Sequence, residues 1–210
     1  MTRPLYILGV FLCLIDMRHG TAVAQIATDH FAVEQDWIVE LGPALSPFQH
    51  VRFCQRYPTE CEPNLNSNAR FLLDSKNLGL LDQINRRVNA AIFPSQKIDA
   101  IWAIAPRFGD CNDYAVTKRH ELLQLGLASS AVRLSVVKTT DGTGHLVVVV
   151  ATTRGDVVLD NLTDDIRLWE ETDYKWLKIQ SKSDPHYWVG LKSPIIASAS
   201  LRKTAVGVNK

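Results

Sequence analysis

The sequence predicts an α+β domain in which helices come first and an antiparallel sheet follows. Two observations support this fold class. Apolar residues recur at helical spacing within residues 76–92 and 111–125. From residue 131 onward, the pattern changes to short strand-like runs that are separated by turn sequences such as DGTG and TTRGD.

The N-terminus predicts export. Arg3 precedes an apolar run over residues 5–15, and residues 22–25 read AVAQ, which is the pattern of a secretory signal peptide. The apolar run is too short for a membrane span, which takes roughly 20 residues; a buried N-terminal helix is the alternative. We expect a signal peptide at 1–24, one domain at 25–210, a periplasmic or secreted bacterial protein, and no stable membrane insertion.

The charge of the chain limits its partners. The whole sequence has 23 basic and 22 acidic residues. Loss of Arg3, Asp16 and Arg18 with the signal peptide leaves 21 of each, a formal charge of 0. A neutral domain argues against partners that are bound by bulk charge, so we expect no nucleic-acid partner.

Three cysteines remain after the predicted cleavage. Cys54 and Cys61 are seven residues apart, with Pro58 between them to promote a turn. In an oxidising compartment they form the natural disulfide pair. A metal site is the alternative, but it lacks a second nearby Cys/His pair to complete four ligands. Cys111 is then the unpaired thiol.

The elements are expected in the following order. Residues 25–65 contain many prolines and are expected to be loop-rich. Residues 76–92 form a first helix that packs on the core. Strands follow the second helix, at 131–138, 145–152, 157–160, 174–180 and 186–192. The run 145–152 is so apolar that both of its faces are expected to be buried.

The second helix should run from Cys111 to Leu125. Asp110 is a good N-cap, and Asp113 can reach back to it as in a capping box. Gly126 is a good C-terminal stop. Cys111 therefore lies in the first turn and faces the positive end of the helix dipole, a setting in which many nucleophilic thiols are found.

The carboxylates of Asp110 and Asp113 oppose a thiolate by like-charge repulsion. Their own capping hydrogen bonds, a nearby imidazolium or a bound cation would offset that repulsion. His145, which opens an apolar strand, is the candidate imidazolium. A core histidine with a satisfied hydrogen bond is the alternative.

His145 and Asp160 lie on consecutive predicted strands. A two-residue loop at 152–153 places them opposite each other, and a longer loop leaves them diagonal neighbours within side-chain reach. Asp160 could instead cap a turn. The roles that fit together are Cys111 as nucleophile, His145 as base and Asp160 as the group that orients His145.

Several segments within residues 45–192 resemble the bacterial transglutaminase-like cysteine peptidases. They are VRFCQRYPTEC, the block WAIAPRFGDCNDYAVTKRHELLQLG, GHLVVVV and TRGDVVLDN. The resemblance implies a papain/transglutaminase-like fold, in which a Cys-bearing helix packs on an antiparallel sheet. By position, it also assigns Cys111, His145 and Asp160 to the catalytic triad of the family.

The resemblance implies a protein substrate. Well-known members clip large surface adhesins and release bacteria from biofilms, and an inner-membrane receptor responsive to cyclic-di-GMP can sequester them. No cofactor is required for the chemistry. Calcium binds beside the cysteine in those members through acidic residues. Here Asp110 is present, but Asn112 stands where Glu is common, which predicts a weakened calcium site because calcium affinity follows ligand charge.

The expected function is that of an exported cysteine peptidase, which forms a thioester on Cys111 that water then hydrolyses. One alternative is transglutaminase-type acyl transfer, in which the same triad passes the acyl group to an amine. Another is a non-enzymatic module that binds a polypeptide in the periplasm.

Overall fold

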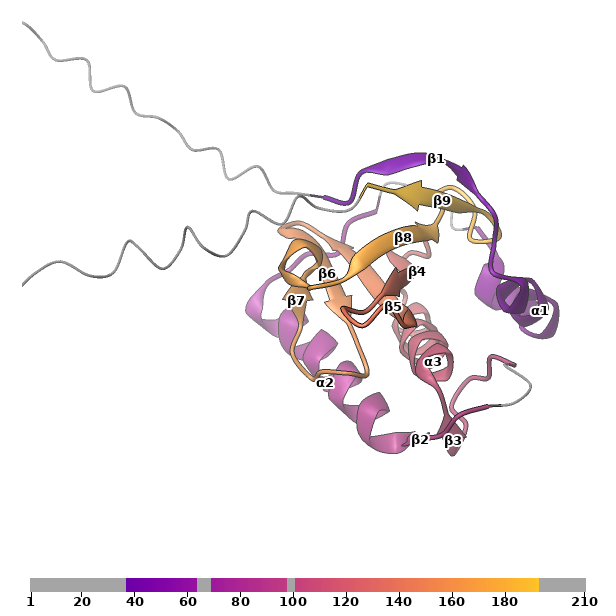
Figure 1. Cartoon of the computed structure of the whole chain (residues 1–210). Helices are drawn as coiled ribbons and strands as arrows, with labels where there is room; N and C mark the ends of the chain where they lie inside the picture. Colours follow the sequence, from indigo (N-terminus) through magenta and orange to yellow (C-terminus); the bar gives the residue numbers. More distant parts are fainter. Residues whose placement is uncertain (1–36, 64–68, 98–100, 193–210) are drawn as a thin grey trace, which may run out of the picture. The chain divides into compact units, whose positions relative to one another are not determined.

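The computed structural model describes residues 37–63, 69–97 and 101–192, all of which belong to one compact unit (Figure 1). The predicted signal peptide lies outside these residues, so it stays a prediction. Among the described helices, none combines the length and the apolar character that a membrane crossing requires.

Three α-helices are described, together with two short 3-10 helices and nine strands. The α-helices are α1 (Phe48–Arg56), α2 (Ser75–Ala91) and α3 (Cys111–Gln124), and the 3-10 helices are η1 (Pro58–Cys61) and η2 (Trp169–Glu171). The strands are β1 (Glu40–Ala44), β2 (Phe93–Pro94), β3 (Phe108–Gly109), β4 (Val132–Lys138), β5 (Gly144–Thr152), β6 (Gly155–Leu159), β7 (Arg167–Leu168), β8 (Lys175–Gln180) and β9 (Trp188–Leu191).

The main sheet of the described residues is antiparallel and has the strand order β1-β9-β8-β4-β5-β6-β7. Its centre is the pair β4 and β5, against which α3 packs, and α2 packs against α3 (Figure 1). The predicted α+β class is therefore confirmed, with the Cys-bearing helix lying on an antiparallel sheet.

The two faces of β5 contribute to two different cores. Val148 and Val150 belong to the core on the side of the helices, and Val147 and Val149 belong to a core on the other side. All four side chains are fully buried. The expectation that this strand is buried on both faces is confirmed. Packing on both sides fixes the position of the strand and of His145 near its start.

The expectation of a loop-rich stretch over 25–65 is wrong for its later part. Residues 40–44 form β1, which pairs with β9, and residues 48–56 form α1. Both elements contain or follow a proline, which by sequence alone favours a loop. Pro43 lies in β1 at the edge of the sheet, where a missing N–H is tolerated, and Pro47 precedes α1, where a proline does not break the helix.

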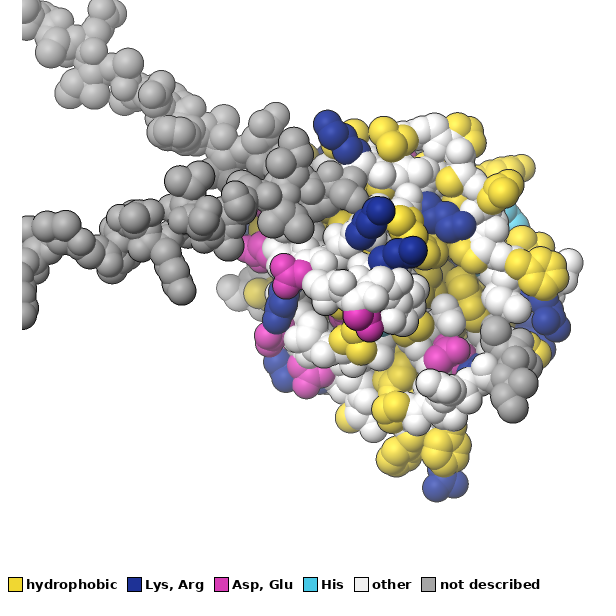
Figure 2. All heavy atoms as spheres, in the orientation of Figure 1, with side chains coloured by type: hydrophobic (Ala, Val, Ile, Leu, Met, Phe, Trp, Pro, Cys, Tyr) yellow, Lys and Arg dark blue, Asp and Glu magenta, His cyan; other side chains and the backbone are white. Residues whose placement is uncertain are grey.

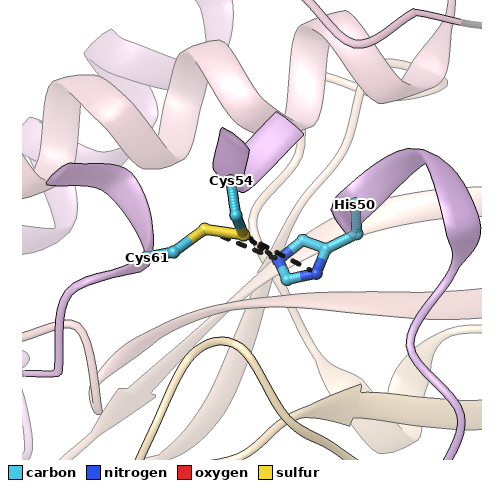
Figure 3. A group of neighbouring side chains, drawn as sticks. All are labelled: His50, Cys54 and Cys61. Carbon is cyan, nitrogen blue, oxygen red and sulfur yellow. Dashed lines mark hydrogen bonds between the residues drawn. A yellow bond between two sulfur atoms is a disulfide. The ribbon is translucent and has the colours of Figure 1, made fainter. Parts of the chain in front are cut away.

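The predicted disulfide joins α1 to η1. The sulfurs of Cys54 and Cys61 are bonded to each other, and the ring of His50 lies beside them, with Nε2 3.5 Å from Cys54 Sγ (Figure 3). These three residues are close enough to suggest metal ligands, but sulfurs in a disulfide are not the thiolates that a metal requires. The structure therefore supports the disulfide and not the metal alternative.

Removing the disulfide should destabilise the domain. In a Cys54→Ala, Cys61→Ala variant, the free energy of unfolding should fall by roughly 2–3 kcal/mol, because the closed loop no longer restricts the unfolded chain. Urea denaturation under oxidising conditions measures the change. As a control, a reductant should destabilise the parent protein and leave the variant unaffected. Equal stability of the two proteins would contradict the prediction.

Candidate active site

The start of α3 has the predicted capping box. The carboxylate of Asp110 accepts a hydrogen bond from the backbone N–H of Asn112 at 2.9 Å, and the carboxylate of Asp113 accepts one from the N–H of Asp110 at 2.9 Å. Cys111 is thereby held as the first helical residue, with its half-buried thiol free of any disulfide.

A lysine that the sequence did not indicate neutralises Asp113. The carboxylate of Asp113 is fully buried and lies 2.9 Å from Lys97 Nζ, and it also accepts the N–H of Ala103 at 2.8 Å. This ion pair removes much of the like-charge repulsion that a thiolate on Cys111 would meet. Lys97 is 16 residues away in sequence, in a segment without a motif, so only tertiary structure reveals it.

Close packing fixes the turn before the helix. A Cβ atom on Gly109 would lie 2.6 Å from the carboxylate oxygen of Asp113. Any side chain at this position would push the capping carboxylate away and displace the start of α3. The glycine therefore contributes to the position of Cys111.

His145 and Asp160 are in direct contact. His145 Nε2 and Asp160 Oδ1 are 2.8 Å apart, and both side chains are buried. The loop between β5 and β6 consists of residues 153–154, because Thr152 pairs with Gly155. The loop lies one residue later than the loop at 152–153 that would place His145 directly opposite Asp160. The two residues are therefore diagonal neighbours on β5 and the end of β6.

Three further contacts hold Asp160 and His145 in place. Asp160 Oδ1 also accepts the N–H of Leu162 at 3.0 Å, and Oδ2 accepts the hydroxyl of Tyr174. The ring of Tyr174 meets the ring of His145 edge to face, with centroids 5.7 Å apart. Sequence reasoning missed Tyr174, because a tyrosine just before a strand gives no signal of its partner.

The electrostatics of the pair favour a charged imidazole. Burial alone would lower the pKa of His145, but hydrogen bonds to Asp160 and Cys111 and their negative charge raise it to about 9. Burial would raise the pKa of Asp160, but the hydrogen bond and charge of His145 outweigh burial and lower it. Since Asp160 takes Nε2, the other ring nitrogen, Nδ1, is left for the thiol.

A buried lysine, Lys118, lies on the same helix as Cys111. Lys118 follows Cys111 by seven residues, about two helical turns, and its side chain is 1% exposed. Its ammonium has no hydrogen-bond partner in the described part of the chain. Burial lowers the pKa of Lys118 to about 7, although the charges of Asp160 and Asp164 act to raise it.

The predicted calcium ligands are poorly arranged for an ion. Calcium takes 6–8 oxygen ligands. Asp110 Oδ1 already accepts both the backbone N–H and the side-chain N–H of Asn112, and Asp113 is paired with Lys97. Within the described residues, no cluster of three or more acidic side chains includes this turn. These contacts do not favour calcium, and binding of the ion at Asp110 and Asn112 stays a prediction.

The arrangement of Cys111, His145 and Asp160 is typical of one class of site. A thiol at a helix start, a buried imidazole with a raised pKa and a carboxylate that orients it are the parts of a nucleophilic cysteine centre. Residues 40–195 match the protein family described as bacterial transglutaminase-like cysteine proteinase BTLCP. The chain belongs to this family of cysteine proteinases, as its sequence motifs predicted.

Solved structures of LapG from Legionella pneumophila are similar to this chain. The calcium-bound form shares 19% identity with a TM-score of 0.45, covering 61% of this chain and 82% of that chain. A second LapG structure shares 19% identity with this chain at a TM-score of 0.43, and an EGTA-treated form shares 20% identity at a TM-score of 0.44. Each of these two matches covers 64% of this chain and 75% of the LapG chain. The curated proteins contain no match to the sequence.

Replacing Lys118 should stabilise the protein. Its folded pKa of about 7 lies below the usual 10.5, so the unfolded chain binds the proton more tightly between these pH values, and stability rises with pH across that window. Lys118→Met should raise the free energy of unfolding at pH 7 by about 1–3 kcal/mol and flatten the rise toward pH 10.

Urea denaturation at several pH values measures this effect. Lys76→Met, which replaces an exposed lysine of α2, is the matched control and should leave the pH profile unchanged. A Lys118→Met profile that is parallel to that of the parent would contradict the prediction.

Proposed function

We propose that this protein is an exported cysteine peptidase in which Cys111, His145 and Asp160 form the catalytic triad. The observation that supports the proposal is the buried His145, whose imidazole lies 2.8 Å from the Asp160 carboxylate and which lines the same hollows as the Cys111 thiol. Membership of a cysteine proteinase family supports the same chemistry.

The proposed reaction has two stages. The Cys111 thiolate attacks the carbonyl carbon of a peptide bond, and His145 protonates the departing amine as the carbon–nitrogen bond breaks. A thioester then links the acyl group to Cys111. His145 takes a proton from water, the resulting hydroxide attacks the thioester carbonyl, and the carbon–sulfur bond breaks, which releases the carboxylic acid and restores the Cys111 thiolate beside the protonated His145.

Neighbouring groups support these steps. The first N–H groups of a helix have no intrahelical acceptor, so the N–H of Cys111 is well placed to donate to the oxyanion. Asp160 keeps Nδ1 of His145 directed at the thiol by holding Nε2. Burial and Asp160 raise the pKa of Tyr174, so its hydroxyl keeps the proton that it donates to Asp160.

The substrate, location and regulation of the protein are inferred from its resemblance to the bacterial transglutaminase-like cysteine peptidases. We infer that the substrate is a protein of the periplasm or cell surface, with a surface adhesin as the first candidate. We also infer a periplasmic or secreted location and sequestration by an inner-membrane receptor. Calcium bound at Asp110 and Asn112 stays a prediction, which the described donor set does not favour.

The proposed function can be tested with the mature protein and with a Cys111→Ala variant. The exported proteome of cells that carry each form is compared by mass spectrometry. New protein N-termini that depend on Cys111 would support a peptidase. Cross-linked chains without new N-termini would identify the transglutaminase alternative, and identical proteomes with a retained cellular phenotype would identify the binding module.

The pH dependence of cleavage should reflect His145. Its raised pKa of about 9 means that the imidazolium is retained at neutral pH and lost as the pH rises through that value. Peptide cleavage should therefore decline above about pH 9, because the leaving amine loses its proton donor. The stability that the ion pair contributes is complete below about pH 6.5, and it is lost as the pH rises from there through about 9.

Asp160→Asn provides the comparison. Without the carboxylate, the pKa of His145 should fall and the upper limb of kcat/KM against pH should move to lower pH, with a lower maximum. Lys175→Met, a change at an exposed residue of β8, should leave the profile in place. An upper limb that Asp160→Asn does not move would argue against the proposed role of the pair.

A further inference from the structure

Cys111 and His145 lie between two hollows of different chemistry. The larger, of about 740 Å³, is lined mostly by polar side chains that include Thr139, Asp141 and Asp173. The smaller, of about 310 Å³, lies toward α1 and is largely apolar. Figure 2 shows hydrophobic side chains gathered on the side of the domain where α1 lies. A polypeptide that is cleaved at Cys111 would enter both hollows.

The smaller hollow has an apolar floor and an aromatic rim. Val136 and Leu146 are paired across β4 and β5 and extend the main core to the surface beside the thiol. Trp102, which is 4% exposed, closes one side, and Phe48 at the start of α1 stands at the rim with 72% of its surface exposed. These apolar side chains therefore line the same hollow as Cys111.

The charge of this hollow selects against basic side chains. Lys178 lines it with its methylene stem, and its ammonium donates to the carbonyl of Leu45 at 2.7 Å. Within the described residues, no acidic side chain lines the hollow. An apolar guest gains contact with the floor, whereas a basic guest would meet the Lys178 charge with no carboxylate to offset it.

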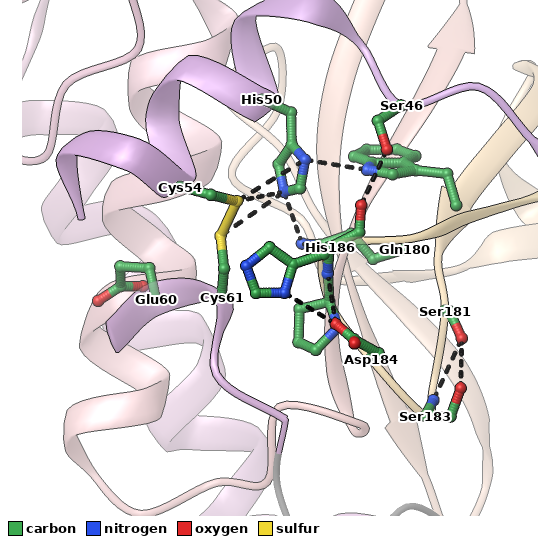
Figure 4. A network of polar contacts seen from close by, with 12 residues as sticks. Ser46, His50, Cys54, Glu60, Cys61, Gln180, Ser181, Ser183, Asp184 and His186 are labelled. Atoms are coloured by element: carbon green, nitrogen blue, oxygen red, sulfur yellow. Dashed lines mark hydrogen bonds and ion pairs between the residues drawn. A yellow bond between two sulfur atoms is a disulfide. The ribbon is translucent and has the colours of Figure 1, made fainter. Parts of the chain in front are cut away.

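The wall that carries Phe48 is firmly attached. The disulfide joins α1 to η1, and on the same helix His50 contacts the sheet (Figure 4). The indole N–H of Trp188 donates to His50 Nδ1 at 3.2 Å, and the side-chain nitrogen of Gln180 lies 3.0 Å from Nε2. Because the wall is held before a ligand arrives, little ordering is required on binding.

The passage between the hollows is open at Gly144. This exposed residue lines both hollows. A Cβ atom there would have no neighbour within 4 Å, and its backbone does not adopt a positive φ. Neither packing nor backbone geometry therefore requires a glycine, and the missing side chain leaves room for an extended chain to pass beside Cys111.

We propose that the smaller hollow is a specificity pocket, which receives an apolar side chain of the substrate within two residues of the bond that Cys111 attacks. The larger hollow then takes the polypeptide on the other side of that bond. This inference rests on the proposed peptidase function and adds the chemical class of the segment that is cleaved.

A peptide library tests the pocket. The mature protein is incubated with peptides prepared from a denatured bacterial proteome, and cleavage sites are identified by mass spectrometry. Leucine, isoleucine, methionine or phenylalanine should be enriched at one fixed position within two residues of the cleaved bond. For a synthetic peptide from the best site, exchanging that residue for alanine should lower kcat/KM about tenfold or more.

Variants of Phe48 test whether the apolar preference arises in the smaller hollow. Phe48→Ala should weaken the apolar preference about tenfold, and Phe48→Glu should shift it toward lysine and arginine. Tyr187→Ala, a change at an aromatic that is 68% exposed and does not line the hollow, is the matched control and should keep the parent preference.

The outcomes separate the two proposals. A library that stays intact contradicts the peptidase function and, with it, the pocket. Cleavage without an apolar preference, or with a preference that both Phe48 variants retain, overturns the pocket and leaves the peptidase function standing. Alkylation of Cys111 by iodoacetamide at the parent rate in each variant shows that the nucleophile itself is unchanged.

Discussion

The hydrogen bond between the buried His145 and Asp160 is the contact on which the rest of the site depends. A buried carboxylate is costly unless its oxygens are paired. Here the imidazole, the N–H of Leu162 and the hydroxyl of Tyr174 pair both oxygens. The hairpin of β5 and β6 brings the pair together because both strands are locked into two cores.

The helix that carries Cys111 is held in place by polar contacts as well as by apolar packing. At its start, Asp113 is paired with Lys97, and in its second half Arg119 Nη1 donates to the backbone carbonyl of Glu60 at 2.6 Å. Glu60 lies in η1, next to the disulfide (Figure 4). The same small element therefore connects the helix that presents the thiol with the helix that forms the wall of the smaller hollow.

Much of the fold was predictable because its patterns are local. The helix over 76–92, the capped start at Asp110 and the strand over 145–152 are each dictated by spacing within a few residues. The chain from 40 to 56 was not, because its strand pairs with β9, more than 100 residues away, and its helix begins after a proline. Long-range pairing leaves no signal in the pairing segment alone.

The sequence by itself determined that Cys111 opens a capped helix, that Cys54 and Cys61 are in reach of each other, and that His145 and Asp160 lie on neighbouring strands. Only the tertiary structure decided what surrounds them. Lys97, Tyr174 and Phe48 come from separate segments, and their contacts depend on how helices and sheet pack. The physical reason is that capping and hairpin register are local, whereas neutralising a buried carboxylate and shaping a hollow require side chains from distant parts of the chain.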